Sequence, residues 1–482
     1  MSVITNLEPK AVWKHFDEIR KIPRCSKHEE KIRKYVEDFA KTHKLRYKTD
    51  DIGNIVISKP GTSGMEKKPI VILQGHLDMV CEKNSDVNFD FSKDAIQLKR
   101  DGDVLAADGT TLGADNGIGV AASLAILEDT ALKHGPLECL FTIDEETGLT
   151  GAFALKSDML KGKILLNLDS EDWGVLTVGC AGGGDSKIKL PIKRQRISDD
   201  LASLVVNISG LRGGHSGVDA HEQRGNAIKV LSRLLWKASK SFEFHLANIK
   251  GGDKHNAIPR EAYATVLINK KQVSDFTSHI KTQGKDILDE IKPIDPNLSV
   301  EIKQGEAISS VFDKKSQNTV LNLLHALPHG VDKMSYDIKG LVETSTNLAT
   351  VVVKDDVVHI GLSSRSSIMS ALQDFRDRIK AAATLAGAEV SEEEPYPGWK
   401  PNLDSKILNL SKKIYKEKYH KEPVVEAIHA GLECGIIGEK FPGMDMVSIG
   451  PTIKYPHSPE EQVHISTVNE FYKFILQILQ QI

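Results

Sequence analysis

The stretch IVILQGHLD at residues 70–78 joins a short apolar run to a histidine and an aspartate. Two later stretches repeat this arrangement: the run at 137–143 leads to Asp144-Glu145-Glu146, and the run at 164–168 leads to Asp169. Short apolar runs of this length predict buried strands. Helical patterns alternate with these runs, at about 28–43 and from about residue 117. The alternation predicts an α/β fold around a central sheet.

Each of these predicted strands ends in side chains that can bind metal. In open α/β sheets, groups that follow the carboxyl ends of the strands meet in one crevice. Asp115 adds a further carboxylate, because it immediately precedes an Ala-rich helical pattern and a loop-to-helix turn would aim it into the same crevice. Imidazole and carboxylate groups suit Zn²⁺, Mn²⁺ or Co²⁺, and one carboxylate can bridge two ions. The sequence therefore predicts a metal site with enough ligands for two ions.

Three competing motifs fail in their sequence context. The stretch GIGVAA at 117–122 fits G-x-G-x-x-A, but it follows a loop, whereas a dinucleotide fingerprint follows a buried strand directly. No G-x-S-x-G motif is present, and Ser216 in GGHSG lacks the strand-elbow-helix frame of a serine nucleophile. The glycines at 182–184 belong to no phosphate-binding signature, so we interpret them as a hinge.

Composition limits the possible partners and location. The 63 basic and 66 acidic residues give a formal charge of -3, which argues against nucleic acid as a partner. No apolar run is long enough to span a bilayer, and the first residues do not resemble a secretion signal, so we expect no membrane association and a cytoplasmic location. The five cysteines are widely spaced and odd in number, which predicts reduced thiols and no disulfide.

The 482 residues are too many for one core and indicate several domains. A change of pattern near the glycines at 182–184, and an acidic, proline-rich stretch at 391–401, mark two boundaries. We therefore expect a first catalytic segment at 1–183, an inserted domain at 184–398 and a second catalytic segment at 399–482. The order strand, helix, strands, helix occurs twice in the insertion, before and after about residue 300.

Seven segments in order resemble the M20 family of di-metal aminopeptidases and deacylases, most closely its aminoacyl-histidine dipeptidase branch. The matching segments are LQGHLDMV at 73–80, DGTTLGADNGIGVA at 108–121, DEETGLTGA at 144–152, NLDSEDWG at 167–174, GLRGGHSGVD at 210–219, HAGLECG at 429–435 and GPTIKYPHSPEE at 450–461. The resemblance implies an α/β, mixed-sheet di-zinc peptidase catalytic domain with an inserted α+β lid of ferredoxin-like units. At about 215 residues the lid is near twice the length of one such unit, so we expect the unit to be doubled.

The resemblance also implies how the metal site is built. His76, Asp115 and Asp169 would hold one ion, and Asp115, Glu146 and His457 the other; both would be divalent, zinc being expected, with cobalt or manganese as substitutes. Asp78 would hydrogen-bond His76, fixing its tautomer. Glu145 matches the general base, which takes a proton from water and passes it to the leaving amine.

Four lid and loop residues match substrate-handling positions of the family. His215 would stabilise the developing oxyanion, Asn256 and Arg365 would hold the terminal carboxylate of the substrate, and Gly431 would let its backbone approach closely. The expected enzyme is a cytoplasmic metallodipeptidase that hydrolyses unblocked dipeptides, preferably Xaa-His, as a monomer or homodimer. A broad dipeptidase, an N-acyl amino acid deacylase and a non-catalytic binding protein remain the alternatives.

Overall fold

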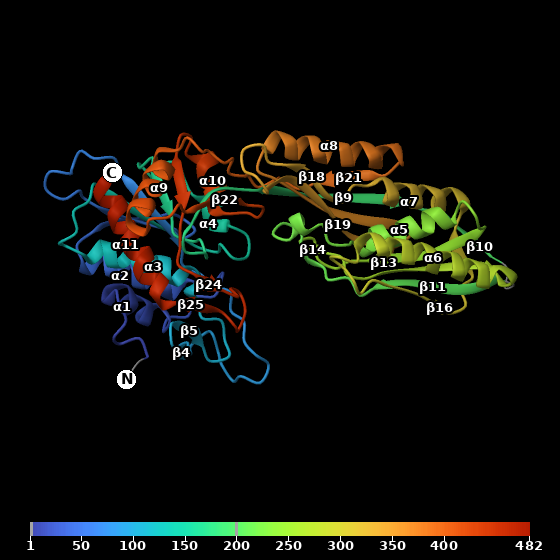
Figure 1. The fold of residues 1–482 in the computed structure, drawn as a ribbon, viewed down its shortest axis with the longest axis horizontal. Coiled ribbons are helices and arrows are strands. Elements are labelled where there is room, and N and C mark those ends of the chain that lie inside the picture. The colour runs from blue at the N-terminus through green and yellow to red at the C-terminus, as the bar shows by residue number, and fades with distance from the viewer. Residues whose placement is uncertain (1–2, 198–200) are drawn as a thin grey trace. The chain divides into compact units, whose positions relative to one another are not determined.

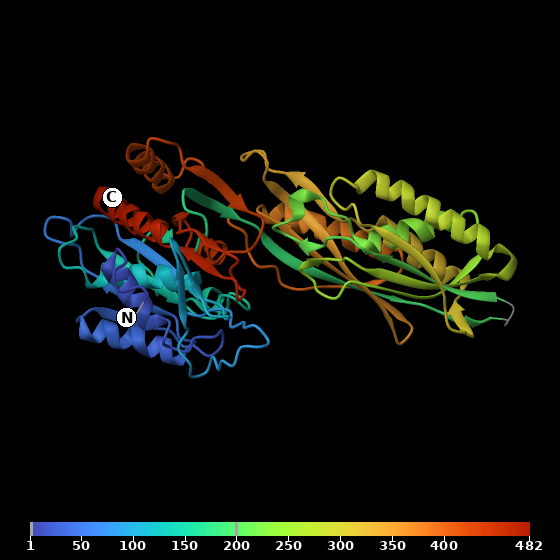
Figure 2. The ribbon, with the colours of Figure 1, turned by 60° about the horizontal axis from the view of Figure 1, so that its bottom comes forward.

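The computed structural model describes residues 3–197 and 201–482, and it divides into two compact units (Figure 1). The first unit comprises Met1–Gly179, Trp399–Ala427 and Leu432–Ile482, and the second comprises Cys180–Gly398 and Ile428–Gly431. Both chain ends lie in the first unit (Figures 1 and 2). That the chain has separate domains with boundaries after residues 183 and 398 stays a prediction.

The first unit is built on an eight-stranded mixed sheet. In spatial order its strands are β1 (Arg46–Thr49), β2 (Ile55–Lys59), β6 (Leu137–Thr142), β3 (Val71–His76), β7 (Ile164–Asn167), β23 (Asp445–Ser448), β8 (Val175–Cys180) and β22 (Val424–Ile428). Strand β3 runs parallel to both β6 and β7, and β23 runs parallel to β7. The carboxyl ends of these four strands therefore meet at one edge of the sheet.

Burial on both faces explains the apolar runs that predicted these strands. Every residue of β3 and β6 is buried, as expected for parallel strands covered by helices on both sides. The three predicted strands are confirmed, although their ends differ from the ends of the apolar runs by one to three residues: β3 ends at His76, β6 at Thr142 and β7 at Asn167.

In the described part of the first unit, seven helices and a small sheet in the order β24-β25-β5-β4 complete the structure. The helices are α1 (Lys10–Ile19), α2 (Glu30–Thr42), α3 (Ala114–Glu128), α4 (Thr150–Ala154), α9 (Lys406–Tyr419), α10 (Glu433–Lys440) and α11 (Ile465–Gln481). The small sheet is formed by β4 (Leu98–Asp101), β5 (Val104–Ala107), β24 (Ile453–Lys454) and β25 (Gln462–His464). Helix α3 is buried from Ala114 to Leu127 and packs on α1 and β3, which explains why it is apolar all round.

The second unit is built on a nine-stranded sheet whose strand pairings, among the described residues, are all antiparallel. One half follows the order β16 (Ser299–Gln304), β11 (Leu201–Ser209), β15 (Ala262–Asn269) and β13 (Phe244–Gly251). The other half follows the order β19 (Val342–Lys354), β20 (Val357–Ser366), β9 (Gly182–Pro191) and β21 (Glu389–Glu392), with β18 (Gly330–Met334) pairing on β19. Short pairs of strands lie outside this sheet: β10 (Arg194–Arg196) with β17 (Ser310–Phe312), and β12 (Gly214–His215) with β14 (Ala257–Ile258).

Four long helices pack along this sheet, as Figures 1 and 2 show. They are α5 (Ala227–Ala238), α6 (Val273–Ile291), α7 (Lys314–Ala326) and α8 (Met369–Leu385), with short 3-10 turns η1 (Ala220–Glu222) and η2 (Lys270–Gln272). In α5 the side chain of Asn226 caps the first turn, accepting hydrogen bonds from the backbone of Ile228 and Lys229. The buried Ile228, Leu231 and Leu235 of α5 form the apolar stripe that faces the core.

Each half of this sheet has the β-α-β-β-α-β order of a ferredoxin-like unit. In the first half this order is β11-α5-β13-β15-α6-β16; in the second it is β9-α7-β19-β20-α8-β21. The expected doubling agrees with this topology. The halves are nested, however, because β9 precedes the whole first half, so the repeat does not begin near residue 300 as the sequence rhythm suggested.

One sequence prediction is wrong: Cys25 and Cys81 form a disulfide, with Cα atoms 5.6 Å apart. The two cysteines are 56 residues apart in sequence. They meet because residue 25 forms a parallel bridge with Met79, whose backbone N–H donates to the carbonyl of Arg24 at 3.1 Å. Cys139 is buried and forms no disulfide with any described residue.

Among residues 3–197 and 201–482, no helix has both the length and the apolar character needed to cross a bilayer.

Candidate metal centre

Two overlapping groups of metal-binding side chains lie at the carboxyl edge of the first unit's sheet. In the first group, His76 at the end of β3 brings its Nε2 within 3.1 Å of an Asp115 oxygen and 3.2 Å of an Asp169 oxygen. In the second group, Nε2 of His457 lies 3.2 Å from the other Asp115 oxygen and 3.0 Å from Glu146. Asp115 is therefore common to both groups, with one oxygen directed at each.

Asp115 is held by the irregular start of helix α3. Asp115 and Asn116 have non-helical backbone angles, and the peptide bond between them is cis. The side-chain amide of Asn116 donates to the carbonyl of Leu168 at 2.7 Å, which ties this turn to the residue before Asp169. A Cβ at Gly119 would come within 2.7 Å of that same carbonyl, so this glycine is needed for close packing. The glycine pattern that resembles a dinucleotide fingerprint thus serves to bring α3 against the strand end.

The charges in both groups fit divalent cations. Asp115 and Asp169 are buried or nearly so, and Glu146 is only 4% exposed. One oxygen each of Glu146 and Asp169 is buried with no hydrogen-bond partner among the described residues. Three close carboxylates and two imidazoles form a donor set that suits zinc, manganese or cobalt. The unpaired Glu146 oxygen, in particular, is available to a cation.

The pKa shifts of the histidines report the same excess of negative charge. Burial opposes the protonation of His76, but Asp169 and Asp115 outweigh it and raise its pKa well above the usual value. Asp115 and Glu146 accept hydrogen bonds from the His457 ring and raise its pKa to about 11. Without cations, protons on the imidazoles would compensate the carboxylates, and bound cations would replace those protons.

Asp78 connects the first metal-binding group to Glu145. One oxygen of this fully buried carboxylate lies 3.3 Å from Nδ1 of His76, which would leave Nε2 free to bind a cation. Its oxygens also accept the backbone N–H groups of Glu145 at 3.1 Å and Glu146 at 3.3 Å. Despite burial, these contacts and the Ser26 hydroxyl at 2.7 Å lower the pKa of Asp78 to about 2. A single carboxylate therefore orients one expected ligand and the loop that carries the expected base.

A row of buried polar side chains crosses the sheet just below these groups. Glu433, at the start of α10, accepts hydrogen bonds from Gln74 at 2.6 Å and Thr142 at 2.7 Å. The amide of Asn167 donates to Gln74 at 2.6 Å, and the hydroxyl of Ser448 donates to Asn167. The row therefore links β6, β3, β7 and β23, and burial raises the pKa of Glu433 to about 7.

The four expected substrate-handling residues lie in the second unit. His215 follows Gly214 in the short strand β12, and burial and the Arg365 charge lower its pKa. Arg365 is 8% exposed and donates to the Tyr396 hydroxyl at 2.8 Å. A Cβ at Gly217 would come within 3.0 Å of Arg365, which places the GGHSG turn against this guanidinium.

Asn256 and Gly431 lie on segments that adjoin this turn. The carbonyl of Asn256 accepts the N–H of Ser216 at 2.8 Å, while its side chain is exposed. Gly431 is the last residue of Ile428–Gly431, a short segment that belongs to the second unit although the residues on either side of it belong to the first. In this segment the His429 ring lies 2.7 Å from the Ser345 hydroxyl. The second unit thus brings a histidine, an arginine and the 428–431 backbone into one neighbourhood.

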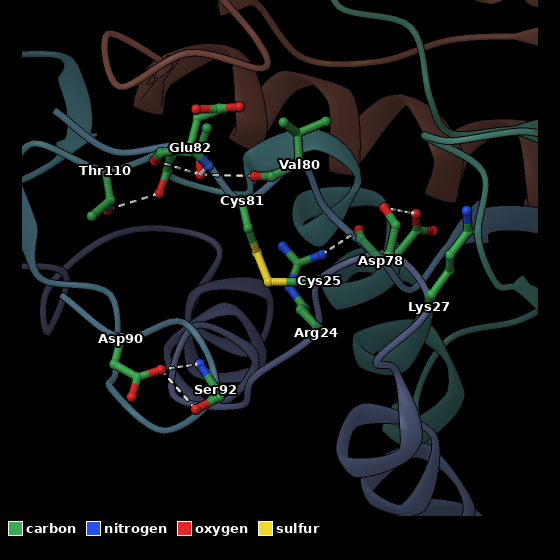
Figure 3. The surroundings of a disulfide bond; sticks show 12 residues. Arg24, Cys25, Lys27, Asp78, Val80, Cys81, Glu82, Asp90, Ser92 and Thr110 are labelled. Atoms are coloured by element: carbon green, nitrogen blue, oxygen red, sulfur yellow. Dashed lines mark hydrogen bonds between the residues drawn. A yellow bond between two sulfur atoms is a disulfide. The ribbon is translucent and has the colours of Figure 1, made fainter. Parts of the chain in front are cut away.

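Sequence reasoning missed two buried charged residues, Arg24 and Glu461. Arg24 donates to the carbonyls of Leu77 at 3.1 Å and Asp78 at 2.7 Å. Glu461 accepts from the backbone of the loop that ends at Asp115. No local pattern distinguishes Glu461 from its exposed neighbour Glu460, although both lie in a matching segment. Figure 3 shows Arg24 and Asp78 beside the Cys25–Cys81 disulfide.

Imidazoles and carboxylates gathered at the carboxyl ends of parallel strands, with no competing nucleophile motif, define the class of metal-dependent hydrolases. The family model described as Peptidase family M20/M25/M40 matches residues 72–481. The chain belongs to this family, and it is an enzyme of the hydrolase class.

Two relatives match the chain over its whole length. The cytosol non-specific dipeptidase of Escherichia coli (strain K12) is 41% identical over 482 residues, covering 100% of this chain and 99% of that protein. The crystal structure of aminoacylhistidine dipeptidase from Vibrio alginolyticus superposes with a TM-score of 0.93 at 41% identity, covering 100% of this chain and 98% of that one. The aminopeptidase PepT from Bacillus cereus ATCC 10987, at 15% identity and a TM-score of 0.57 over 98% of this chain and 99% of that one, shares the fold. The expected α/β mixed-sheet peptidase fold is confirmed.

Proposed function

We propose that this metal-dependent dipeptidase of the M20 family hydrolyses unblocked dipeptides and prefers those with a C-terminal histidine. The observation that carries the reaction is the pair of metal-binding groups that share Asp115. The histidine preference is supported by the likeness to the aminoacylhistidine dipeptidase. A relative of equal identity is called a non-specific dipeptidase, so broad dipeptide specificity is the second candidate. The name of that relative also supports a cytoplasmic location.

In this proposal, His76, Asp115 and Asp169 hold one divalent ion, and Asp115, Glu146 and His457 hold the other. Zinc is the expected metal, and cobalt or manganese would fit the same donors. When bound, such ions lower the pKa of a water to about 7 and polarise a carbonyl group.

Glu145 acts as the general base beside these groups. Its backbone is fixed by Asp78, and its carboxylate takes a proton from the attacking water and delivers it to the leaving amine. Without cations, the pKa of Glu145 lies well above its usual value, mainly because the carboxyl group is buried and also because the negative charges of Asp169 and Glu433 are near. Positive charge in the two groups would lower that pKa and keep the base ionised near neutral pH.

The second unit handles the substrate. His215 donates a hydrogen bond to the developing oxyanion, and Arg365 and Asn256 bind the terminal carboxylate, which excludes longer peptides. Gly431 leaves room for the backbone of the substrate.

The test is the initial rate of the zinc- or manganese-loaded protein on Xaa-His dipeptides, other dipeptides, a tripeptide and N-acetylated amino acids. Glu145→Gln should keep the metal and the fold but lose turnover by several orders of magnitude, whereas Glu460→Gln, which alters an exposed side chain, should behave as the unchanged protein. Chelation should abolish activity, and added metal should restore it.

Equal rates on all dipeptides would replace the histidine preference with broad specificity. Turnover of the acetylated substrates alone would make the protein a deacylase. Near-normal turnover by Glu145→Gln would remove this residue from the role of base.

A further inference from the structure

The Glu461 carboxylate binds four consecutive backbone N–H groups. One oxygen accepts from Leu112 at 2.8 Å and Gly113 at 2.9 Å, and the other accepts from Ala114 at 2.7 Å and Asp115 at 3.3 Å. The Glu461 side chain is 2% exposed. The four donors run from the end of the loop before α3 into the irregular first residues of that helix, so this carboxylate fixes the backbone up to the shared ligand Asp115 itself.

Glu461 also belongs to the segment that supplies the second imidazole. It follows His457 by four residues, and the N–H of Glu461 donates to the Ser458 carbonyl at 3.0 Å, which closes a turn between them. Strand β25 begins at the next residue, Gln462, and pairs with β5. One buried side chain therefore connects the His457 loop to the Asp115 loop, although the two ligands are 342 residues apart.

Arg24 holds the same loop from the other side. Its guanidinium, 2% exposed, donates to the Gly113 carbonyl, while Glu461 accepts from the Gly113 N–H. Gly113 has a φ of 69°, and a Cβ there would overlap the Arg24 guanidinium. Because Arg24 also binds the Leu77 and Asp78 carbonyls, it joins the segment after His76 to the Asp115 loop.

We propose that Glu461 and Arg24 are positioning residues that lock the three ligand-bearing loops together, and that Glu461 sets the affinity of the Asp115, Glu146 and His457 group for its metal ion. Neither residue is a ligand, and neither touches substrate. The inference rests on the proposed function, because it assigns the two groups to two ions. Partners that orient metal ligands through hydrogen bonds commonly change metal affinity or activity by 10- to 100-fold when they are replaced.

Glu461→Gln is the decisive variant. It keeps the size of the side chain but turns an –NH₂ group toward backbone donors, so at least one of the two pairs of N–H groups loses its acceptor. The matched control is Glu460→Gln, one residue earlier and exposed. The metal-free proteins are titrated with Co²⁺ while visible absorption, stoichiometry and thermal midpoint are recorded, and kcat and KM are then measured on a dipeptide.

Glu461→Gln should bind the first cobalt ion within about threefold of the unchanged protein and the second at least tenfold more weakly, with an altered spectrum at full loading. Its kcat should fall by about 10- to 100-fold while KM changes little. If it binds both ions with unchanged affinity and spectrum and only its thermal midpoint falls, Glu461 merely stabilises the fold and the proposal is overturned.

Arg24→Lys provides a second variant if Glu461→Gln does not fold. It keeps the charge, but an ammonium group cannot reach all three carbonyls in the planar geometry of a guanidinium. It should also weaken cobalt binding and lower kcat, and unchanged cobalt binding would contradict the proposal. Should the unchanged protein fail to bind two ions, the proposed function would fail, whereas normal binding by both variants would refute only the positioning roles.

Discussion

Reduction of the Cys25–Cys81 disulfide should destabilise the first unit. The bond closes a loop of 56 residues in the unfolded chain. The entropy of closing a loop of that length corresponds to about 4 kcal/mol at 25 °C. For a unit of this size, each kcal/mol shifts the thermal midpoint by roughly 2–4 °C, so complete reduction should lower it by roughly 8–16 °C.

The assay is thermal unfolding with and without a dithiol reductant, alongside thiol counting in denaturant. The Cys25→Ser/Cys81→Ser protein is the control: it should unfold at the lower midpoint and show no further response to reductant. An unchanged midpoint after verified reduction would refute the entropic reasoning. Five free thiols in the untreated protein would show that the bond does not form in solution.

Two further predictions concern a loop of the first unit and a histidine of the second. Gly113→Ala should lower the free energy of unfolding, measured in urea, by more than about 1 kcal/mol. An L-residue is strained at φ 69°, and its Cβ would displace Arg24 and approach the Met79 sulfur within 2.7 Å. Unchanged stability would show that the loop can relax. Burial and the Lys229 charge lower the pKa of His329 from 6.5 to about 4. As the pH falls, this histidine therefore takes up a proton in the unfolded state at a higher pH than in the folded state. About 3 kcal/mol of folding stability should be lost between pH 6.5 and 4. In the His329→Gln protein, the free energy of unfolding from urea titrations should change less with pH between 6.5 and 4. An equally steep change would assign the loss to other groups.

The sequence predicted features that depend on neighbours along the chain. Buried parallel strands leave continuous apolar runs, so β3, β6 and β7 and the ligands after them could be recognised from local pattern alone. His457 is different: its spacing does not distinguish it from the other histidines, and only the family resemblance selected it.

Features that depend on distant contacts could not be predicted. The insertion of β23 between β7 and β8 depends on packing between segments far apart in sequence. The Cys25–Cys81 bond depends on a bridge at Met79 that has no local signature. Glu461 looks like its neighbour Glu460 until the fold buries one of them, and the nesting of the second unit is concealed because β9 is separated from its partner strands by a whole ferredoxin-like half.

The polar row of Glu433, Gln74, Asn167 and Ser448 has a consequence for how the chain finds its strand register. Successive side chains of a strand point to opposite faces, so a slip of one residue in β3 would turn Gln74 away from both Glu433 and Asn167. The displaced amide and its abandoned partners would then be buried without hydrogen bonds, each at a cost of about 1–3 kcal/mol. Apolar strands such as these could pair favourably in several registers, but only the native register satisfies the hydrogen bonds of the polar row. That register is also the one in which His76 and Asp169 face each other at the edge of the sheet.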